Sequence, residues 1–190
     1  MTTTTEQPYT NGVDVSTLLA TREAVRGNPE IAKFQFRAAN LWVKGTHSVS
    51  TYDGFHGVGQ EMAHRQRTEV VSDHPEVLVG TDHGPTPVEY LLHALAACVT
   101  TSLVYSAAAR RVKLTMVEST LEGDLNVEGA MGTNTVDFRN GFERIRMSIR
   151  IAGDAPAEKL REVVQRGTDR SVVFDSITKG VPVSVDVDTV

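Results

Sequence analysis

The chain has 190 residues, of which 40% are hydrophobic and 23% charged, and its formal net charge is −5 at pH 7. This length suits one domain, or one domain with an added segment, and the composition is ordinary for a soluble globular protein. The negative charge argues against a nucleic acid or an anionic membrane as the main partner. We expect no secretory signal and no membrane-spanning helix. Because a chain with one cysteine forms no internal disulfide, we expect a cytoplasmic protein.

The first fifty residues predict a polar tail, a helix and a hairpin. Residues 1–12 are polar and rich in threonine, and we expect them to fray. Residues 14–26 carry leucine, alanine and valine at helical spacing, and Gly27 ends that pattern. Residues 33–51 then predict two strands with a turn near Lys44.

The stretch 53–84 is expected to be mostly loop. Glycine, histidine and aspartate are scattered along it and interrupt any regular period. Only the apolar residues between Pro75 and Gly80 suggest one short strand.

A long apolar helix is predicted next, and its start is well marked. Thr86, Pro87 and Glu89 stand at the N-cap, first and third positions of a capping box. The helix carries no charge between Glu89 and Arg110, so we expect it to be buried nearly all round, at the centre of the fold or of a dimer. Its helical stripe consists of Leu91, Leu95, Cys98, Ser102 and Tyr105.

Beyond this helix the period changes to two, which is typical of strands. In residues 115–129 apolar or small residues alternate mainly with acidic ones, and in residues 142–153 they alternate mainly with basic ones. This pattern predicts antiparallel neighbours with cross-strand ion pairs. The alternative is that Arg144, Arg146 and Arg150 form a basic patch for a ligand.

The remaining residues complete an α+β pattern. Asp154 is predicted to cap a helix over 154–170, a short second helix follows at 171–180 with Asp175 near its end, and 181–190 alternate as a closing strand. The order of elements predicts an α+β fold, with mostly antiparallel sheets packed around the long hydrophobic helix.

Three stretches together resemble the OsmC/Ohr family of peroxide-detoxifying proteins (osmotically inducible protein C-like). The first is GPTPVEYLLHALAAC at residues 84–98, where the spacing from proline to cysteine is that of the family. The second is the strand pair after the helix, and the third is RSVVFDSITKGVPVSV at residues 170–185. The resemblance covers residues 33–190, so we expect an OsmC-like domain there and an added N-terminal tail and helix in residues 1–32.

The resemblance implies an intertwined homodimer with active sites at the dimer interface. It also implies a thiol peroxidase cycle without a cofactor, in which Cys98 attacks the peroxide oxygen and becomes a sulfenic acid. In the family a second cysteine then captures the sulfenic acid, and an external dithiol regenerates the pair. Only a thiolate is a good nucleophile for this step, and the chemistry is reversible up to the sulfenate or disulfide.

Two departures from the family pattern concern groups that act with the thiol. Ser171 stands where the family has its second cysteine, so an oxidised Cys98 needs an outside thiol or the Cys98 of a neighbouring subunit. The family's catalytic glutamate directly follows the proline, whereas this chain has Val88 there and Glu89 one position later, which turns the side chain by about 100° on a helix. The alternative role of Glu89 is that of a capping residue alone.

A third departure concerns the family's arginine, which comes from the first hairpin and helps to hold the thiolate and the peroxide. Lys44 is the cation near the equivalent turn, and it lacks the rigid fork of a guanidinium, while Arg37 lies several residues earlier. Without a nearby cation, Cys98 among alanine, leucine and valine would be an inert packing residue.

We therefore interpret the sequence as an OsmC-like homodimer with two candidate functions. The first is a thiol-dependent peroxidase that reduces organic hydroperoxides or hydrogen peroxide, with Cys98 as nucleophile, Glu89 and Lys44 as candidate positioning groups, and an external thiol as reductant. The alternative is a non-catalytic dimer that binds a small apolar ligand in its interfacial pocket. Neither nucleic acid nor a membrane is expected as partner. The six histidines have no metal-ligand spacing, so no metal site is predicted.

Overall fold

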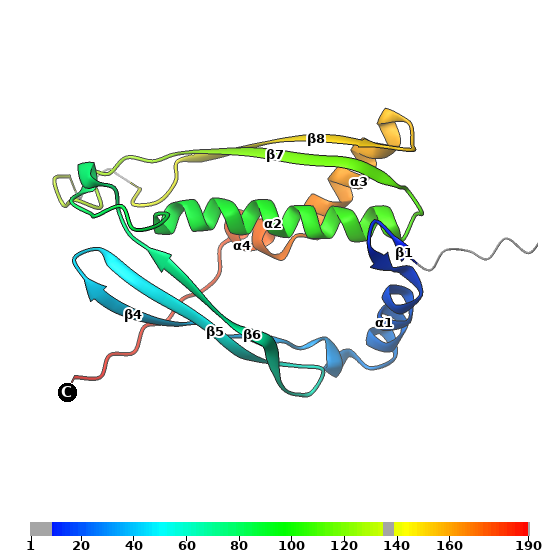
Figure 1. Ribbon diagram of the computed structural model, residues 1–190, viewed down its shortest axis with the longest axis horizontal. Coiled ribbons are helices and arrows are strands. Elements are labelled where there is room, and N and C mark those ends of the chain that lie inside the picture. Colours follow the sequence, from blue (N-terminus) through cyan, green and yellow to red (C-terminus); the bar gives the residue numbers. More distant parts are fainter. Residues whose placement is uncertain (1–8, 135–138, 190) are drawn as a thin grey trace, which may run out of the picture. The chain divides into compact units, whose positions relative to one another are not determined.

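The computed structural model describes residues 9–134 and 139–189, and the chain forms two compact units (Figure 1). One unit consists of residues 14–91. The other consists of the residues up to 13 together with those from 92 onward. The long helix α2, Pro87–Ala108, contributes its first residues to one unit and the rest to the other. The fold is α+β with antiparallel sheets, as predicted.

The unit of residues 14–91 is a helix followed by a four-stranded sheet. Helix α1, Val15–Gly27, begins where the Asp14 side chain accepts a hydrogen bond of 3.0 Å from the Thr17 N–H, and the short 3-10 helix η1 follows it. The long strand β5 pairs with β3 and β4 along one side and with β6 along the other. The bounds are η1 Pro29–Ala32, β3 Gln35–Phe36, β4 Ala39–Lys44, β5 His47–Gly57 and β6 Gln60–Ser72.

The predicted helix and hairpin are confirmed, but the prediction of a loop over residues 53–84 is wrong. Strand β6 fills 13 residues of that stretch. Its sequence is almost entirely polar in the first part and lacks alternation, so the backbone pairing with β5 left no trace in the pattern. The expected strand at 75–80 is also wrong. Glu76–Leu78 form the 3-10 helix η2, and Val77 and Val79 on either side of Leu78 are exposed rather than buried.

Helix α2 begins with the predicted capping box. The Thr86 N–H donates to Glu89 Oε2 over 2.7 Å, and the Glu89 N–H donates to Thr86 Oγ1 over 3.3 Å. The expectation that no segment could span a membrane was too strong, because α2 is long and apolar enough by length and composition, with a mean hydropathy of 1.5. A core helix also has this length and hydropathy. The expectation that α2 is buried nearly all round is wrong for the single chain: one side of α2 lies in the core of the second unit, whereas Val88, Leu91 and Tyr105 are exposed.

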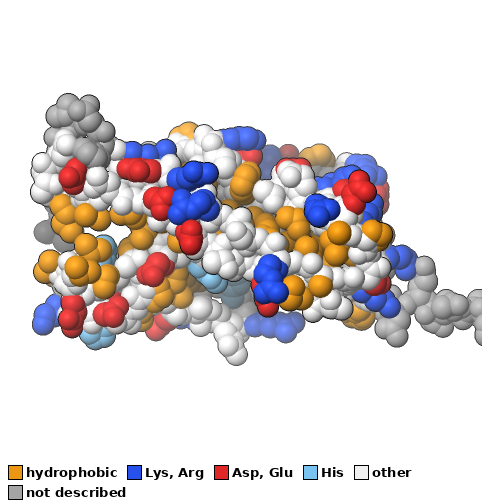
Figure 2. Space-filling model, turned by 90° about the horizontal axis from the view of Figure 1, so that it is seen from above, with side chains coloured by type: hydrophobic (Ala, Val, Ile, Leu, Met, Phe, Trp, Pro, Cys, Tyr) orange, Lys and Arg blue, Asp and Glu red, His pale blue; other side chains and the backbone are white. Residues whose placement is uncertain are grey.

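In that second unit, strands β7, Leu114–Asp124, and β8, Arg144–Gly153, form an antiparallel pair whose outer face is charged. Glu118 lies opposite Arg150 with 2.8 Å between their charged atoms, and Arg146 bonds to both Glu122 and Asp124. Figure 2 shows acidic and basic side chains next to each other on this face. The predicted cross-strand ion pairs are confirmed.

The core of this unit lies under β7 and β8. Its buried residues come from one side of α2, from α3, Ala157–Asp169, and from Val112 between α2 and β7. Helix α3 approaches α2 closely because its Gly167 has no side chain, and a Cβ built there would lie 2.6 Å from Leu103 Cα. The fully or nearly buried apolar residues are Leu95, Val99, Leu103, Ala107, Val112, Leu160 and Val163.

Two predictions for the C-terminal third need correction. Asp154 does not cap α3, whose N-cap is Pro156; its carboxylate instead accepts a 2.8 Å hydrogen bond from the Lys113 N–H. The short helix is confirmed as α4, Val172–Lys179, where Asp175 forms an ion pair with Lys179. The closing strand is not formed in residues 181–189, because a strand needs a partner and no described strand pairs with this segment.

The N-terminal hairpin is held to the second unit by one asparagine. Strands β1, Tyr9–Thr10, and β2, Val13–Asp14, are joined by Asn11 and Gly12, both with positive φ, as a tight hairpin turn requires. The Asn11 amide donates to the Val112 carbonyl over 2.9 Å and accepts from the Leu114 N–H over 2.8 Å. Residues 9–12 are therefore ordered rather than frayed, whereas residues 1–8 of the predicted tail lie outside the described residues.

Candidate functional site

Cys98, the only thiol of the chain, lies half-buried on α2. The residues one turn before and one turn after Cys98 on the helix are all uncharged, namely Ala94, Leu95, Thr101 and Ser102. A cation that stabilises its thiolate must therefore come from another element or from a second chain.

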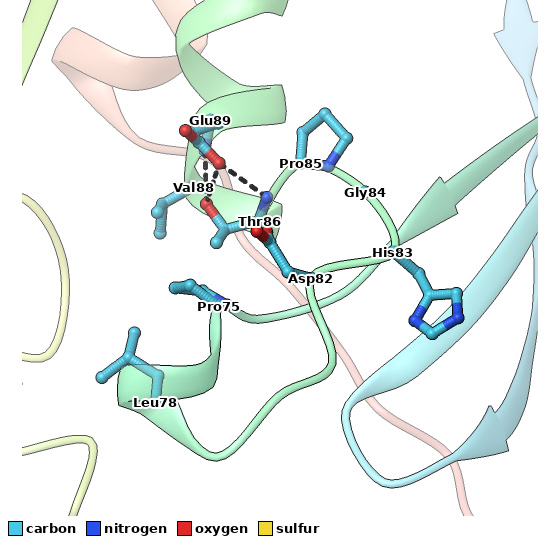
Figure 3. Close-up of a pocket in the computed structure, with 9 residues that line it drawn as sticks. All are labelled: Pro75, Leu78, Asp82, His83, Gly84, Pro85, Thr86, Val88 and Glu89. Carbon is cyan, nitrogen blue, oxygen red and sulfur yellow. Dashed lines mark hydrogen bonds between the residues drawn. The ribbon is translucent and has the colours of Figure 1, made fainter.

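Glu89 lies at the first turn of α2, is exposed, and uses one carboxylate oxygen for the cap. Oε2 accepts hydrogen bonds from the Thr86 N–H and the Thr86 hydroxyl at 2.7 and 2.8 Å. These two bonds lower the pKa of the Glu89 carboxyl below its usual value. The other oxygen, Oε1, makes no hydrogen bond to the described part of the chain, and Figure 3 shows it directed away from the bonds to Thr86.

Glu89 and Cys98 cannot meet within one chain. They stand nine residues apart on one continuous helix, which places them on opposite faces and about 13 Å apart along the axis. Any joint action of the two groups therefore requires a second copy of the chain.

The candidate cations lie on the four-stranded sheet, at Lys44, and in the short segment between its strands β3 and β4, at Arg37. Lys44 ends β4, is exposed, and forms no ion pair with a described residue. Arg37 binds both carboxylate oxygens of Glu61 at 2.8 and 2.9 Å and also contacts Gln35. The Arg37 guanidinium, helped by His56, lowers the pKa of the Glu61 carboxyl to about 2. Arg37 is thus already neutralised by a partner, whereas Lys44 is free.

Ser171, at the position of the family's second cysteine, has a structural role. It is buried, and its hydroxyl accepts a 3.2 Å hydrogen bond from the Phe174 N–H as the N-cap of α4. A hydroxyl does not form a disulfide, so it leaves Cys98 without an internal resolving group.

A cavity of about 520 Å³ lies beside the first turn of α2 (Figure 3). Its wall combines apolar residues with two carboxylates, and Glu89 is the one predicted site residue among those that line it. The ring of His83 points away from the cavity in Figure 3. The lining residues are Pro75, Leu78, Asp82, His83, Gly84, Pro85, Thr86, Val88 and Glu89.

The loop that forms this cavity is organised around Asp73, a residue that sequence reasoning missed. The side chain of Asp73 is fully buried, and its carboxylate accepts hydrogen bonds of 2.5 and 2.6 Å from the hydroxyls of Thr46 and Thr81. It also accepts from the backbone N–H groups of His74, Thr81 and His83. Nothing in the local pattern distinguishes this aspartate from its exposed neighbours.

The described residues contain no group of three or more histidine, cysteine or acidic side chains placed to hold a metal ion. The site features are therefore a lone thiol on a long apolar helix and a cavity at the start of that helix.

This arrangement defines an α+β protein with a single candidate nucleophile. The model of the OsmC-like protein family matches residues 80–186, which is more than half of the chain, so the chain belongs to the OsmC-like family. No curated protein sequence matches it.

Solved structures agree with this fold at low identity. An OsmC-like protein from Mycoplasma pneumoniae is 14% identical, with a TM-score of 0.58 over 76% of this chain and 87% of that one. An OsmC-like protein of unknown function from Vibrio cholerae is 12% identical, with a TM-score of 0.52 over 75% of this chain and 92% of that one. A hypothetical protein from Aquifex aeolicus is 13% identical, with a TM-score of 0.53 over 76% and 87%.

Proposed function

We propose that the protein is a cytoplasmic, one-cysteine peroxidase that reduces organic hydroperoxides or hydrogen peroxide with an external thiol. The observation that carries this proposal is Cys98, a partly buried residue on α2, eleven residues after Pro87, in a chain of the OsmC-like family. No cofactor takes part.

The proposed cycle uses one thiol of the protein and two of the reductant. The Cys98 thiolate attacks one peroxide oxygen and the O–O bond breaks. The other oxygen leaves as an alkoxide, or as hydroxide from hydrogen peroxide, and takes up a proton to become an alcohol or water. The resulting sulfenic acid reacts with an external thiol to give a mixed disulfide and water. A second external thiol, or the second group of a dithiol, then releases Cys98 and leaves as disulfide.

Lys44 and Glu89 are the candidate positioning groups in this proposal, and both would act across a dimer. Lys44 has a free ammonium group, which favours the thiolate of a cysteine placed near it. Glu89 has one free carboxylate oxygen, which can accept a proton or a hydrogen bond from the substrate. Ser171 supports α4 and takes no part in the cycle.

We expect oxidation of Cys98 by cumene hydroperoxide to add one oxygen atom to the intact mass at neutral pH, and a dithiol to reverse it. Replacing Cys98 with serine should abolish thiol-dependent peroxide consumption, by about a thousandfold or more, because the nucleophile is lost. Stopped-flow mixing followed by intact mass spectrometry measures both. A thiol that resists oxidation until the protein is unfolded would refute the catalytic function.

The alternative is a non-catalytic dimer that binds a small apolar ligand. It is favoured by the engagement of Glu89 in the helix cap and by the absence of charge around Cys98 on α2. Unreactive Cys98 together with saturable binding of an apolar probe would support this alternative.

The proposed assembly is a homodimer, and it is supported by large hydrophobic side chains that are exposed on the four-stranded sheet: Phe36, Leu41, Trp42 and Val43.

The sheet of β3 to β6 offers an apolar face to such an interface. Leu41, Val49 and Val71 lie side by side across β4, β5 and β6, and Leu41 is 70% exposed. On the opposite face Asn40 lies beside Ser50 and donates to its hydroxyl over 2.8 Å.

Replacing Leu41 with glutamate should therefore weaken the dimer by about 100-fold, because a charge would have to be buried without a partner. Light scattering coupled to size exclusion should give about 41 kDa for the unchanged protein. The matched control is Asn40→Glu on the opposite face, which should remain dimeric. A monomeric unchanged protein, or equal dissociation by both variants, would refute the assembly.

A further inference from the structure

The cavity beside the first turn of α2 holds two carboxylates for which the described residues show no ion pair. Glu89 is bonded only to Thr86, and the Asp82 side chain has no hydrogen bond or ion pair within the described residues. Helix α2 directs its N-terminus toward this cavity, and its dipole supplies about half a positive charge there, which offsets only part of two negative charges.

The one lining residue that could become a cation is used elsewhere. Nδ1 of His83 lies 2.7 Å from the Thr81 hydroxyl and 3.4 Å from Asp73 Oδ2, and Figure 3 shows the ring pointing out of the cavity. The imidazole of His83 therefore belongs to the Asp73 cluster rather than to the cavity.

The rest of the wall is apolar and of the right size for a small organic molecule. Pro75, Leu78 and Val88 face the cavity in Figure 3, and its volume of about 520 Å³ falls in the range of ordinary ligand pockets. A ligand that fits this wall has a short apolar body and a group that donates hydrogen bonds to Glu89 Oε1 and Asp82.

We propose that this cavity binds a small cationic amphiphile, an alkyl or aryl group that carries an ammonium, and discriminates against carboxylates of the same size. An ammonium satisfies the free acceptors and is attracted by both charges, whereas a carboxylate meets two like charges.

The binding test uses hexylammonium and hexanoate, two probes with the same chain and opposite charge. Amide NMR shifts of the full-length Cys98→Ser protein should place hexylammonium at residues 75–89 and give it a dissociation constant at least about tenfold below that of hexanoate. High salt should reduce this ratio, because the carboxylates are exposed.

The charge variants decide whether the two carboxylates cause the preference. Asp82→Asn combined with Glu89→Gln should bring the ratio close to one, and Glu89→Gln keeps the capping box because glutamine also serves at that position. Glu76→Gln is the matched control, since it removes one charge from the same loop outside the cavity lining. It should leave the ratio near that of the unchanged protein.

Equal binding of the two probes, shifts outside residues 75–89, or an unchanged ratio in the double variant would overturn the proposal. Because the probes carry no peroxide and the protein tested has no thiol, this result is independent of the oxidation of Cys98. An inert Cys98 with selective amine binding would refute the peroxidase and leave the cavity proposal standing.

Discussion

Replacing Gly167 with alanine should lower the free energy of unfolding by about 2–3 kcal/mol, because the added methyl group has no room. Its Cβ would lie 2.5 Å from Leu103 Cβ, 2.6 Å from Leu103 Cα and 2.7 Å from the Leu103 backbone N. Two of these atoms belong to the backbone of α2, so no rotation of a side chain relieves the contact. Helix α3 would have to move away from α2, and the core between them would open.

Thermal unfolding measures this effect, with an expected fall in Tm of roughly 5–10 °C for a chain of this size. The matched control is Gly27→Ala in α1, where nothing lies within 4 Å of the added Cβ. In a helix alanine is favoured over glycine, so the control should keep or slightly raise Tm. Equal effects of the two substitutions would show that α3 does not pack on α2 through Gly167.

The sequence predicted best those elements whose side chains alternate between core and solvent. The ion pairs between β7 and β8 and the capping box at Thr86 each leave a clear signal in one segment. The stripe predicted on α2 was wrong apart from Leu95, because the buried side of the helix continues through Val99, Leu103 and Ala107 while Leu91 and Tyr105 are exposed. Strand β6 leaves none, because it pairs through its backbone and carries polar residues on both faces over most of its length. The alternation in residues 181–189 predicted a strand that is not formed. A strand needs a pairing partner, and the sequence of one segment does not specify that partner.

The candidate site was predictable only as far as it follows from the family pattern. The position of Cys98 and the departures at Glu89 and Ser171 were visible in the sequence, and their roles stay predictions. The cavity was not visible, because its wall comes from a loop whose apolar residues resembled a strand. Nor did the sequence separate Asp73 from Asp82, although one is fully buried and the other exposed. That difference arises from Thr46, which reaches Asp73 from 27 residues away.

Replacing Asp73 with asparagine should lower Tm by roughly 5–10 °C, because it sets donors against donors in a buried site. Asp73 Oδ1 accepts from the Thr46 hydroxyl and the His74 N–H, and Oδ2 accepts from Thr81 and His83. The threonine hydroxyls can turn to accept from an asparagine NH₂, but the backbone N–H groups cannot, so an NH₂ in either place leaves at least one of them without its acceptor. The loop that carries the cavity would lose its attachment, so hexylammonium binding should weaken as well.

The hydrogen bonds to Asp73 also make the stability of the protein depend on pH. The hydroxyl of Thr46, then that of Thr81 and the backbone N–H groups, hold the pKa of the Asp73 carboxyl far below its usual range. A carboxyl whose pKa is lowered on folding stabilises the protein above its unfolded pKa, and this contribution is lost as pH falls below about 4. The Tm of the unchanged protein should therefore fall steeply below pH 4, and the Tm of Asp73→Asn should fall less over the same range.

The control for both measurements is Asp53→Asn on β5, an exposed aspartate 3.6 Å from Arg67. Exposed ion pairs contribute little to stability. This variant should therefore have the same Tm at neutral pH as the unchanged protein and the same fall of Tm below pH 4. If Asp73→Asn matched Asp53→Asn in both, the carboxylate would not anchor the loop. If Asp73→Asn lowered Tm at neutral pH but its Tm fell with pH as steeply as that of the unchanged protein, the shape of the Asp73 side chain rather than its charge would be required.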